Sequence, residues 1–219
     1  IGSKRVSGWL APGTLTVIKL LDTAQRSKNI SGGVAEIGVH HGRLFIGLSL
    51  LQRQNEHSVA IDLFGDQELN IDKSGCGDID QFRKNLDRWA SMDTVAIHQG
   101  DSTRLAASEV CNLAKAQIRF FSVDGGHTDE IVFSDMKLAE GALCAGGIVI
   151  ADDVFNEWWP GVASGTLRYM QQDGSLQPFA VGFNKVFFSS PEYVGFYRDT
   201  LADRLENRHP LVVKTSHLG

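Results

Sequence analysis

The stretch Val34-Ala-Glu-Ile-Gly-Val-His-His-Gly42 passes from an apolar run into a segment with two glycines. Its first six residues are predicted to form a buried strand. Gly38 and Gly42 predict a tight turn after that strand, because glycine lets the backbone bend sharply and come close to a ligand. Leucines then recur at helical spacing over residues 44–54. We therefore predict a strand, a glycine turn and a helix in succession.

The same alternation continues along the rest of the chain. Further strands are predicted over residues 58–62, 95–98, 118–124 and 147–152. Further helices are predicted over residues 78–90, 103–115, 129–143, 162–172 and 190–205, with an earlier one over 15–27. Two short β runs, 179–182 and 185–189, are separated only by a short link at Asn184, which predicts a hairpin.

Strands separated by helices of about 10–15 residues imply βαβ units and a parallel sheet. We predict a single-domain α/β fold of the Rossmann-like kind, with a seven-stranded, mostly parallel sheet. A C-terminal antiparallel β-hairpin completes the sheet, and helices cover both faces. Residues 1–29 are expected to form an N-terminal helical cap or lid, and residues 30–219 the main domain. A length of 219 residues with 42% hydrophobic residues suits one folded domain.

Charge and cysteine content exclude several classes of protein. Lys and Arg total 21 against 26 Asp and Glu, a net charge of −5, and no basic cluster occurs, so no nucleic acid is expected as a partner. The three cysteines form no CxxC pair, which excludes a disulfide framework and suits a reducing cytoplasm. No apolar run reaches the ~20 residues that span a bilayer, and no signal peptide is recognised. We expect a cytoplasmic enzyme for a small molecule, with no membrane partner; a homo-oligomer is left open.

Acidic side chains follow almost every predicted strand. In an open α/β sheet, ligands bind beyond the carboxyl ends of the strands, so these side chains are the first candidates for a site. They are Glu36, Asp62, Asp101, Asp124, Asp152 and Asp153. A carboxylate in this position accepts hydrogen bonds from a ligand or holds a cation.

The last three of these acids predict a metal site. Adjacent strands would bring Asp124, Asp152 and Asp153 together, where three carboxylates repel one another and raise each other's pKa. A divalent cation relieves that repulsion, and all-oxygen ligands select a hard ion such as Mg²⁺ or Ca²⁺. The alternative is that one Asp caps the following helix while the others are solvated.

His127 follows Asp124 by three residues and is expected in the loop above the same edge. An ordinary histidine pKa, near ~6.5, suits a general base, so His127 is the candidate proton acceptor. A hydrogen bond within the turn is the other interpretation of this residue.

Several motifs together carry a resemblance to a known family. The E-x-G-x-x-x-G spacing of residues 36–42 resembles motif I of class I S-adenosylmethionine-dependent methyltransferases, whereas the dinucleotide fingerprint G-x-G-x-x-G is missing its middle glycine. The other motifs are Phe121-Ser-Val-Asp-Gly-Gly-His-Thr-Asp-Glu130, Gly146-Gly-Ile-Val-Ile-Ala-Asp-Asp-Val154 and Asn184-Lys-Val-Phe-Phe188. Over about residues 30–190 the chain looks like the Mg²⁺-dependent O-methyltransferases of the macrocin, or macrolide-sugar, type.

This resemblance implies methyl transfer from S-adenosylmethionine to a hydroxyl of a small molecule, a sugar or glycosylated natural product. The residues that it places around the cofactor are Glu36, Gly38, His40, Gly42, Asp62, Asp101, Ser102 and Asp124, with Asp101 and Ser102 facing the adenine. It places Mg²⁺, or another hard divalent cation, on Asp124, Asp152 and Asp153. His127 would be the base, with Asp124 beside it at the reacting end. Many relatives have Gly where His40 stands.

Other functions fit parts of the pattern. A catechol or phenol O-methyltransferase is the alternative within the family, although such relatives have Lys in place of His127 and Asn in place of Asp153. A non-catalytic S-adenosylmethionine-binding module is a second alternative. An NAD-dependent or nucleotide-sugar enzyme is disfavoured by the missing glycine and the crowded acids. Trp158 and Trp159 are expected to form a substrate wall, or else to pack in the core or a subunit contact. Residues 64–77 form the polar loop where a lid is expected.

Overall fold

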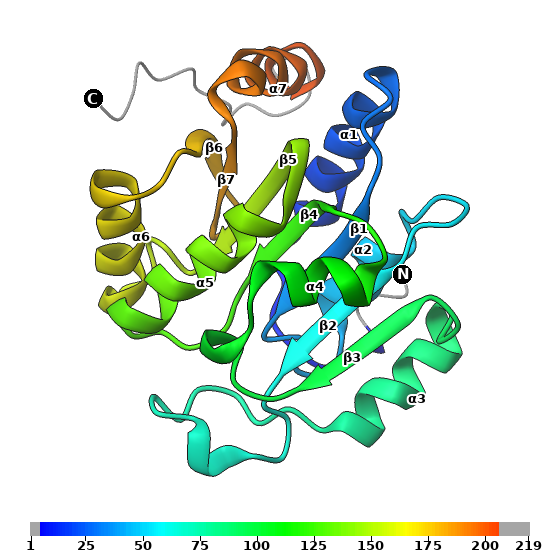
Figure 1. The fold of residues 1–219 in the computed structure, drawn as a ribbon, viewed down its shortest axis with the longest axis vertical. Coiled ribbons are helices and arrows are strands. Elements are labelled where there is room, and N and C mark those ends of the chain that lie inside the picture. Colours follow the sequence, from blue (N-terminus) through cyan, green and yellow to red (C-terminus); the bar gives the residue numbers. More distant parts are fainter. Residues whose placement is uncertain (1–4, 206–219) are drawn as a thin grey trace.

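The computed structural model describes residues 5–205 of the chain. Seven strands form one sheet in the order β3-β2-β1-β4-β5-β7-β6 (Figure 1). The strands are β1 (Gly33–Ile37), β2 (Ser58–Asp62), β3 (Val95–Gln99), β4 (Ile118–Val123), β5 (Leu143–Asp152), β6 (Gln177–Gly182) and β7 (Lys185–Ser189). β1 to β5 run parallel, and β7 runs antiparallel to both β5 and β6. The predicted Rossmann-like sheet with its C-terminal hairpin is confirmed.

Helices cover both faces of this sheet, as predicted. They are α1 (Thr14–Ser27), α2 (Arg43–Ser49), α3 (Ile79–Trp89), α4 (Ala107–Ala114), α5 (Asp129–Ala142), α6 (Pro160–Gln172) and α7 (Pro191–Leu205). α4, α5 and α6 pack on one face, while α1, α2 and α7 pack on the other (Figure 1). α3 joins α2 in a third apolar cluster at the β2–β3 side of the sheet.

Successive side chains along each strand point to opposite faces of the sheet. Phe121 and Val149 belong to the core under α4 and α5, whereas their neighbours Phe120 and Ile148 belong to the core under α1 and α7. Because both faces are covered, β1 and β4 are buried along their whole lengths. This double burial explains why these strands are mostly apolar in the sequence, with Glu36 in β1 and Arg119 in β4 as buried exceptions.

Two helices are shorter than the sequence periodicity predicts. α2 ends at Ser49, before the predicted end at residue 54. The carboxylate of Glu56 accepts hydrogen bonds from the backbone amides of Gly32, at 3.1 Å, and Arg53, at 2.9 Å, and so draws the chain after α2 towards the sheet. The other predicted helix, 103–115, divides into a 3₁₀ turn over residues 102–104 and then α4.

A buried ion network joins α1 to the sheet. Arg119 in β4 is fully buried, and its guanidinium lies 2.9 Å from a carboxylate oxygen of Asp22 and 3.1 Å from one of Glu56. The side-chain amide of Gln25, also in α1, donates to the carbonyl oxygen of Arg119 at 2.9 Å. The predicted helix before β1 is therefore present and held by the sheet, while its division from the main domain at residue 29 stays a prediction.

Bilayer-spanning helices need about 20 consecutive apolar residues. Within residues 5–205, no helix is long and apolar enough to cross a bilayer.

Candidate functional site

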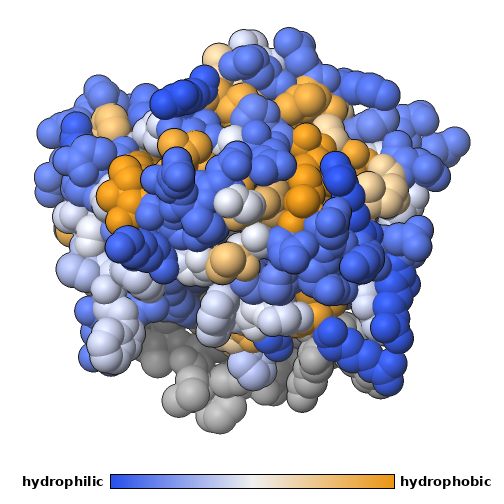
Figure 2. Space-filling view, turned by 90° about the horizontal axis from the view of Figure 1, so that it is seen from below, coloured by the Kyte–Doolittle hydropathy of each residue, from blue (hydrophilic) through white to orange (hydrophobic). Residues whose placement is uncertain are grey.

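A cavity of about 720 Å³ opens at the carboxyl edge of the sheet, between the loops that follow β1 to β5 and the segment before α1. Figure 2 shows this side of the molecule, where hydrophobic surface is interspersed with hydrophilic surface. The predicted site residues that line the cavity are Gly38, His40, Asp62, Asp101, Ser102, Asp124, His127, Asp152 and Asp153. The structure thus brings together side chains from five separate strand ends.

The loop after β1 passes very close to the loop after β4. Gly38 has a φ of 81°, and a Cβ built at this position would lie 1.6 Å from the carbonyl oxygen of Asp124. The carboxylate of Asp62 accepts the backbone amides of His40, at 2.7 Å, and Phe64, at 2.6 Å. Asp62 therefore connects the loops after β1 and β2 while its side chain lines the cavity.

Glu36 and Gly42 lie outside the wall of this cavity, although the sequence resemblance grouped them with the cofactor residues. Glu36 is 2% exposed within β1, and its Oε2 has no hydrogen-bond partner in the described structure. Burial raises the pKa of the Glu36 carboxyl to about 8. Gly42 precedes α2, where a Cβ would meet the Phe82 ring at 2.9 Å. The two residues therefore lie at the two ends of the glycine loop, Glu36 in β1 and Gly42 directly before α2.

The wild-type protein is expected to lose stability as pH rises, because the buried carboxyl of Glu36 must then give up its proton. Glu36→Gln should remove this loss. The folded state holds this proton up to a pKa of about 8, whereas the ordinary value is 4.5. The stability associated with the proton is therefore fully present below pH 4.5 and is lost as pH rises to about 8. We expect the variant to match the wild type at pH 4.5 and to exceed it by on the order of 4 kcal/mol at pH 8.5. Urea unfolding across this range measures the difference; parallel profiles for the two proteins would contradict it.

Asp124, His127 and Asp153 form the group that the geometry favours for a cation. Each offers one ligand atom, and the three atoms all lie within 4.8 Å of one another. The sequence predicted Asp152 as the third member in place of His127. In the structure, Asp152 instead pairs with the ammonium of Lys185, which is 3% exposed and directly opposite it in the antiparallel β5–β7 register. The donor set of two carboxylates and one imidazole fits a single divalent cation.

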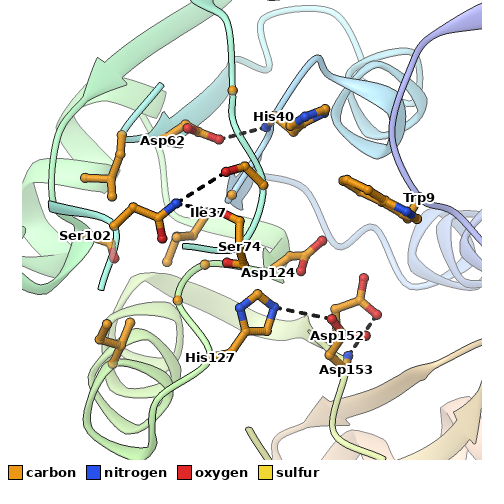
Figure 3. Close-up of a pocket in the computed structure, with 18 of the residues that line it drawn as sticks. Trp9, Ile37, His40, Asp62, Ser74, Ser102, Asp124, His127, Asp152 and Asp153 are labelled. Atoms are coloured by element: carbon orange, nitrogen blue, oxygen red, sulfur yellow. Dashed lines mark hydrogen bonds and ion pairs between the residues drawn. The ribbon is translucent and has the colours of Figure 1, made fainter. Parts of the chain in front are cut away.

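His127 is held on three sides. Its Nδ1 lies 2.9 Å from Oδ2 of Asp72, and its ring stacks on Trp159 with centroids 4.3 Å apart. Its Nε2 lies 3.3 Å from Oδ2 of Asp153 (Figure 3). Burial lowers the pKa of His127, but the hydrogen bonds to Asp153 and Asp72 outweigh burial and raise it above the ordinary value. His127 therefore lies hydrogen-bonded between two carboxylates, and its role as the proton acceptor stays a prediction.

Comparison with known proteins assigns the family. The family model described as "Methyltransferase domain" (Methyltransf_24) matches residues 35–154, more than half of the chain. The chain belongs to this family of methyltransferases. The predicted methyltransferase enzyme is therefore confirmed. No curated protein sequence matches the chain.

Solved structures share the methyltransferase fold at low sequence identity. The O-methyltransferase NovP is 15% identical, with a TM-score of 0.63, over 80% of this chain and 79% of NovP. CalS11, a TDP-rhamnose 3'-O-methyltransferase in calicheamicin biosynthesis, is 16% identical, with a TM-score of 0.57, over 82% of this chain and 81% of that one. The O-methyltransferase TomG from Streptomyces achromogenes, solved in complex with S-adenosylmethionine, is 14% identical, with a TM-score of 0.61, over 83% and 80%. These likenesses establish the fold.

Sequence reasoning missed two polar residues: Lys185, which lines the methyltransferase cavity, and Asp72, which contacts His127 from outside the lining. Lys185 was visible only as part of the Asn184-Lys-Val-Phe-Phe188 motif, and nothing in the sequence links it to Asp152. Asp72 belongs to the polar loop of residues 64–77, which was predicted as a lid, but its contact with His127 spans 55 positions. At the other end of the cavity, Asp101 accepts the backbone amide of Thr103 at 3.0 Å and so shapes the turn beside the predicted adenine position.

Apolar side chains surround the mouth of the cavity. Trp9 and Ile71 line it and are 79% and 71% exposed. Trp159 also lines it, packed on His127, whereas Trp158 is 77% exposed and is not part of the lining. Figure 3 places Trp9 across the cavity from His127. Of the two tryptophans, only Trp159 lines the cavity, and the N-terminal segment contributes a wall of its own, while the substrate role of Trp159 stays a prediction.

Proposed function

We propose that this methyltransferase transfers the methyl group of S-adenosylmethionine to a hydroxyl of a small molecule, a sugar or glycosylated natural product, with the help of a divalent cation. One observation carries the proposal: a single cavity joins the glycine loop at Gly38 to the group of Asp124, His127 and Asp153. The O-methyltransferases NovP, CalS11 and TomG share this fold, and TomG was solved with S-adenosylmethionine.

The cofactor would occupy the half of the cavity between the glycine loop and the loop after β3. Gly38 allows its loop to pass against the carbonyl oxygen of Asp124, and Asp62 holds that loop from the adjacent strand end. Asp101 and Ser102 line the far end, where the adenine would lie. Asp124 lies between the two halves (Figure 3), so the methyl group would be delivered next to it.

The acceptor hydroxyl would approach from the half that contains His127 and Trp159. Methyl transfer is an in-line displacement, so holding the hydroxyl against the methyl carbon lowers the barrier by several kcal/mol, ~7 or more in the best-aligned cases. A divalent cation on Asp124, His127 and Asp153 would lower the pKa of the hydroxyl and position its oxygen. The residues of the chain orient the acceptor and exclude water through Trp159 and the loop of Asp72. The hydroxyl proton, made more acidic by the cation, would leave to solvent.

The test combines cofactor binding with turnover. S-adenosylhomocysteine is titrated calorimetrically into EDTA-treated protein, and methyl transfer is then followed for a panel of sugars, glycosides and catechols with and without added Mg²⁺ or Mn²⁺. We expect binding of the cofactor product without metal, and turnover that needs metal. Asp153→Ala should keep the binding and lose at least ~100-fold in turnover, while the exposed Asp203→Ala, on α7, should keep both.

Three outcomes would count against the proposal. Absence of S-adenosylhomocysteine binding removes the cofactor assignment. Full turnover in EDTA removes the metal. Turnover restricted to catechols replaces the sugar-type acceptor with the phenolic one.

A further inference from the structure

We propose that His127 is itself a ligand of the metal, through Nε2, with Asp72 as the carboxylate that fixes its ring, and that the site therefore prefers Mn²⁺ or Zn²⁺ to Mg²⁺. This inference deepens the proposed function, because it concerns the metal of the same cavity and rests on it. It departs from the all-oxygen site of three aspartates that the sequence predicts.

The first support is the position of the ligand atoms. Asp124, His127 and Asp153 point one ligand atom each into a common space, with all three within 4.8 Å. Asp153 is fixed in that direction by its backbone, which has a φ of 58°, and by the side-chain amide of Asn156, which donates to its Oδ1 at 2.9 Å. Its other oxygen, Oδ2, is left for the cation and for His127.

The second support is the partner of the other imidazole nitrogen. Histidines that bind metals usually donate their second ring N–H to a carboxylate, which fixes the tautomer and the ring orientation. Nδ1 of His127 lies 2.9 Å from Oδ2 of Asp72, and the backbone amide of His127 donates to the same oxygen. Oδ1 of Asp72 accepts the amide of Ser74 at 2.8 Å, so the carboxylate is already oriented by its own loop. Nε2 is then the nitrogen that faces the two aspartates.

The third support is that Asp152, the remaining aspartate of the predicted metal site, already has other partners. Asp152 pairs with the buried ammonium of Lys185, and its Oδ1 accepts the backbone amide of Asp153 at 2.9 Å. The protein donors left for the cation are two carboxylate oxygens and one imidazole nitrogen. Mg²⁺ favours oxygen ligands alone, whereas imidazole suits the transition metals and Zn²⁺.

The experiment measures metal affinity and detects whether a histidine nitrogen is bound to the metal. EDTA-treated protein is titrated with Mg²⁺, Mn²⁺ and Zn²⁺ by calorimetry, and the Mn²⁺ form is examined by pulsed EPR for coupling to a histidine ¹⁴N nucleus. We expect tighter binding of Mn²⁺ and Zn²⁺ than of Mg²⁺, with ¹⁴N coupling in the wild type. His127→Gln should lose both the coupling and the preference. Asp72→Asn should keep the coupling but weaken Mn²⁺ binding by roughly 10–100-fold.

His57→Gln is the matched control, because His57 lies outside the cavity and its ring Nδ1 lies 3.3 Å from the carbonyl oxygen of Asn55. It should behave as the wild type. Failure of the wild type to bind Mn²⁺, absence of ¹⁴N coupling, or a preference that survives His127→Gln overturns the proposal and leaves His127 as a base. S-adenosylhomocysteine binding in EDTA, measured on the same samples, reports separately on the proposed function, since it does not depend on the identity of the metal ligands.

Discussion

Gly38→Ala is expected to abolish cofactor binding and to lower the free energy of unfolding by about 2–6 kcal/mol, the sum of left-handed backbone strain and overpacking. The φ of 81° is strained for alanine, and the new Cβ would lie 1.6 Å from the carbonyl oxygen of Asp124. That oxygen cannot move aside as a flexible side chain can, because the amide of Asp124 donates to the carbonyl of Ile37 at 3.0 Å and holds the two loops together. The methyl group would therefore displace Asp124 itself.

Urea unfolding and calorimetric titration with S-adenosylhomocysteine measure the two effects of Gly38→Ala. Gly65→Ala is the matched control, because its Cβ would meet no atom within 4 Å. It should change neither the unfolding free energy nor the affinity appreciably. A Gly38→Ala protein that binds the cofactor product like the wild type would show that the approach of the two loops is not part of the cofactor site.

Lys185→Met is expected to destabilise the fold by about 3–5 kcal/mol, the usual cost of removing one partner of a buried ion pair. Lys185 is 3% exposed, and its ammonium pairs with Asp152. Burial lowers the pKa of Lys185, but the neighbouring charges of Asp152, Asp124 and Glu36 raise it above the ordinary value, so the side chain is charged. Methionine fills a similar volume and leaves these carboxylates without a cation.

The pH dependence of this variant has a definite sign. Burial and the neighbouring Asp152 raise the pKa of Asp124 well above its ordinary value, and removal of Lys185 takes away a group that lowers it. An acid with a raised folded-state pKa costs more stability as pH rises, so the deficit of Lys185→Met should be larger at pH 8 than at pH 5. Urea unfolding at both values measures it.

The double variant Lys185→Met/Asp152→Asn separates charge from packing. If the deficit arises from the unpaired carboxylate, the second substitution should restore a large part of the lost stability. A double variant as unstable as the single one would assign the loss to packing around the lysine side chain instead.

The local elements of this protein follow from its sequence because their signals are local. The apolar runs of β1 and β4 and the helical periodicity of α5 lie within single segments, and the hairpin is set by two turn residues with positive φ, Phe183 and Asn184. Acids at the ends of parallel strands must meet at one edge, so the position of the cavity also follows. The end of α2 does not follow from a local signal alone, because the carboxylate of Glu56, which accepts the local amide of Arg53, also accepts the amide of Gly32, 24 positions earlier.

The sequence alone determined the edge of the sheet where the chemistry occurs and most of the residues that line it. Only the tertiary structure decided how the charges there are paired. Asp152 meets Lys185 across 33 positions, and His127 meets Asp72 across 55. Both pairings depend on an antiparallel register and on the path of a long loop, which no local pattern specifies. As a result, the candidate metal group contains His127 in place of Asp152. Asp152 pairs with the buried ammonium of Lys185, and the carboxylate of Asp72 orients the imidazole of His127 towards the cavity.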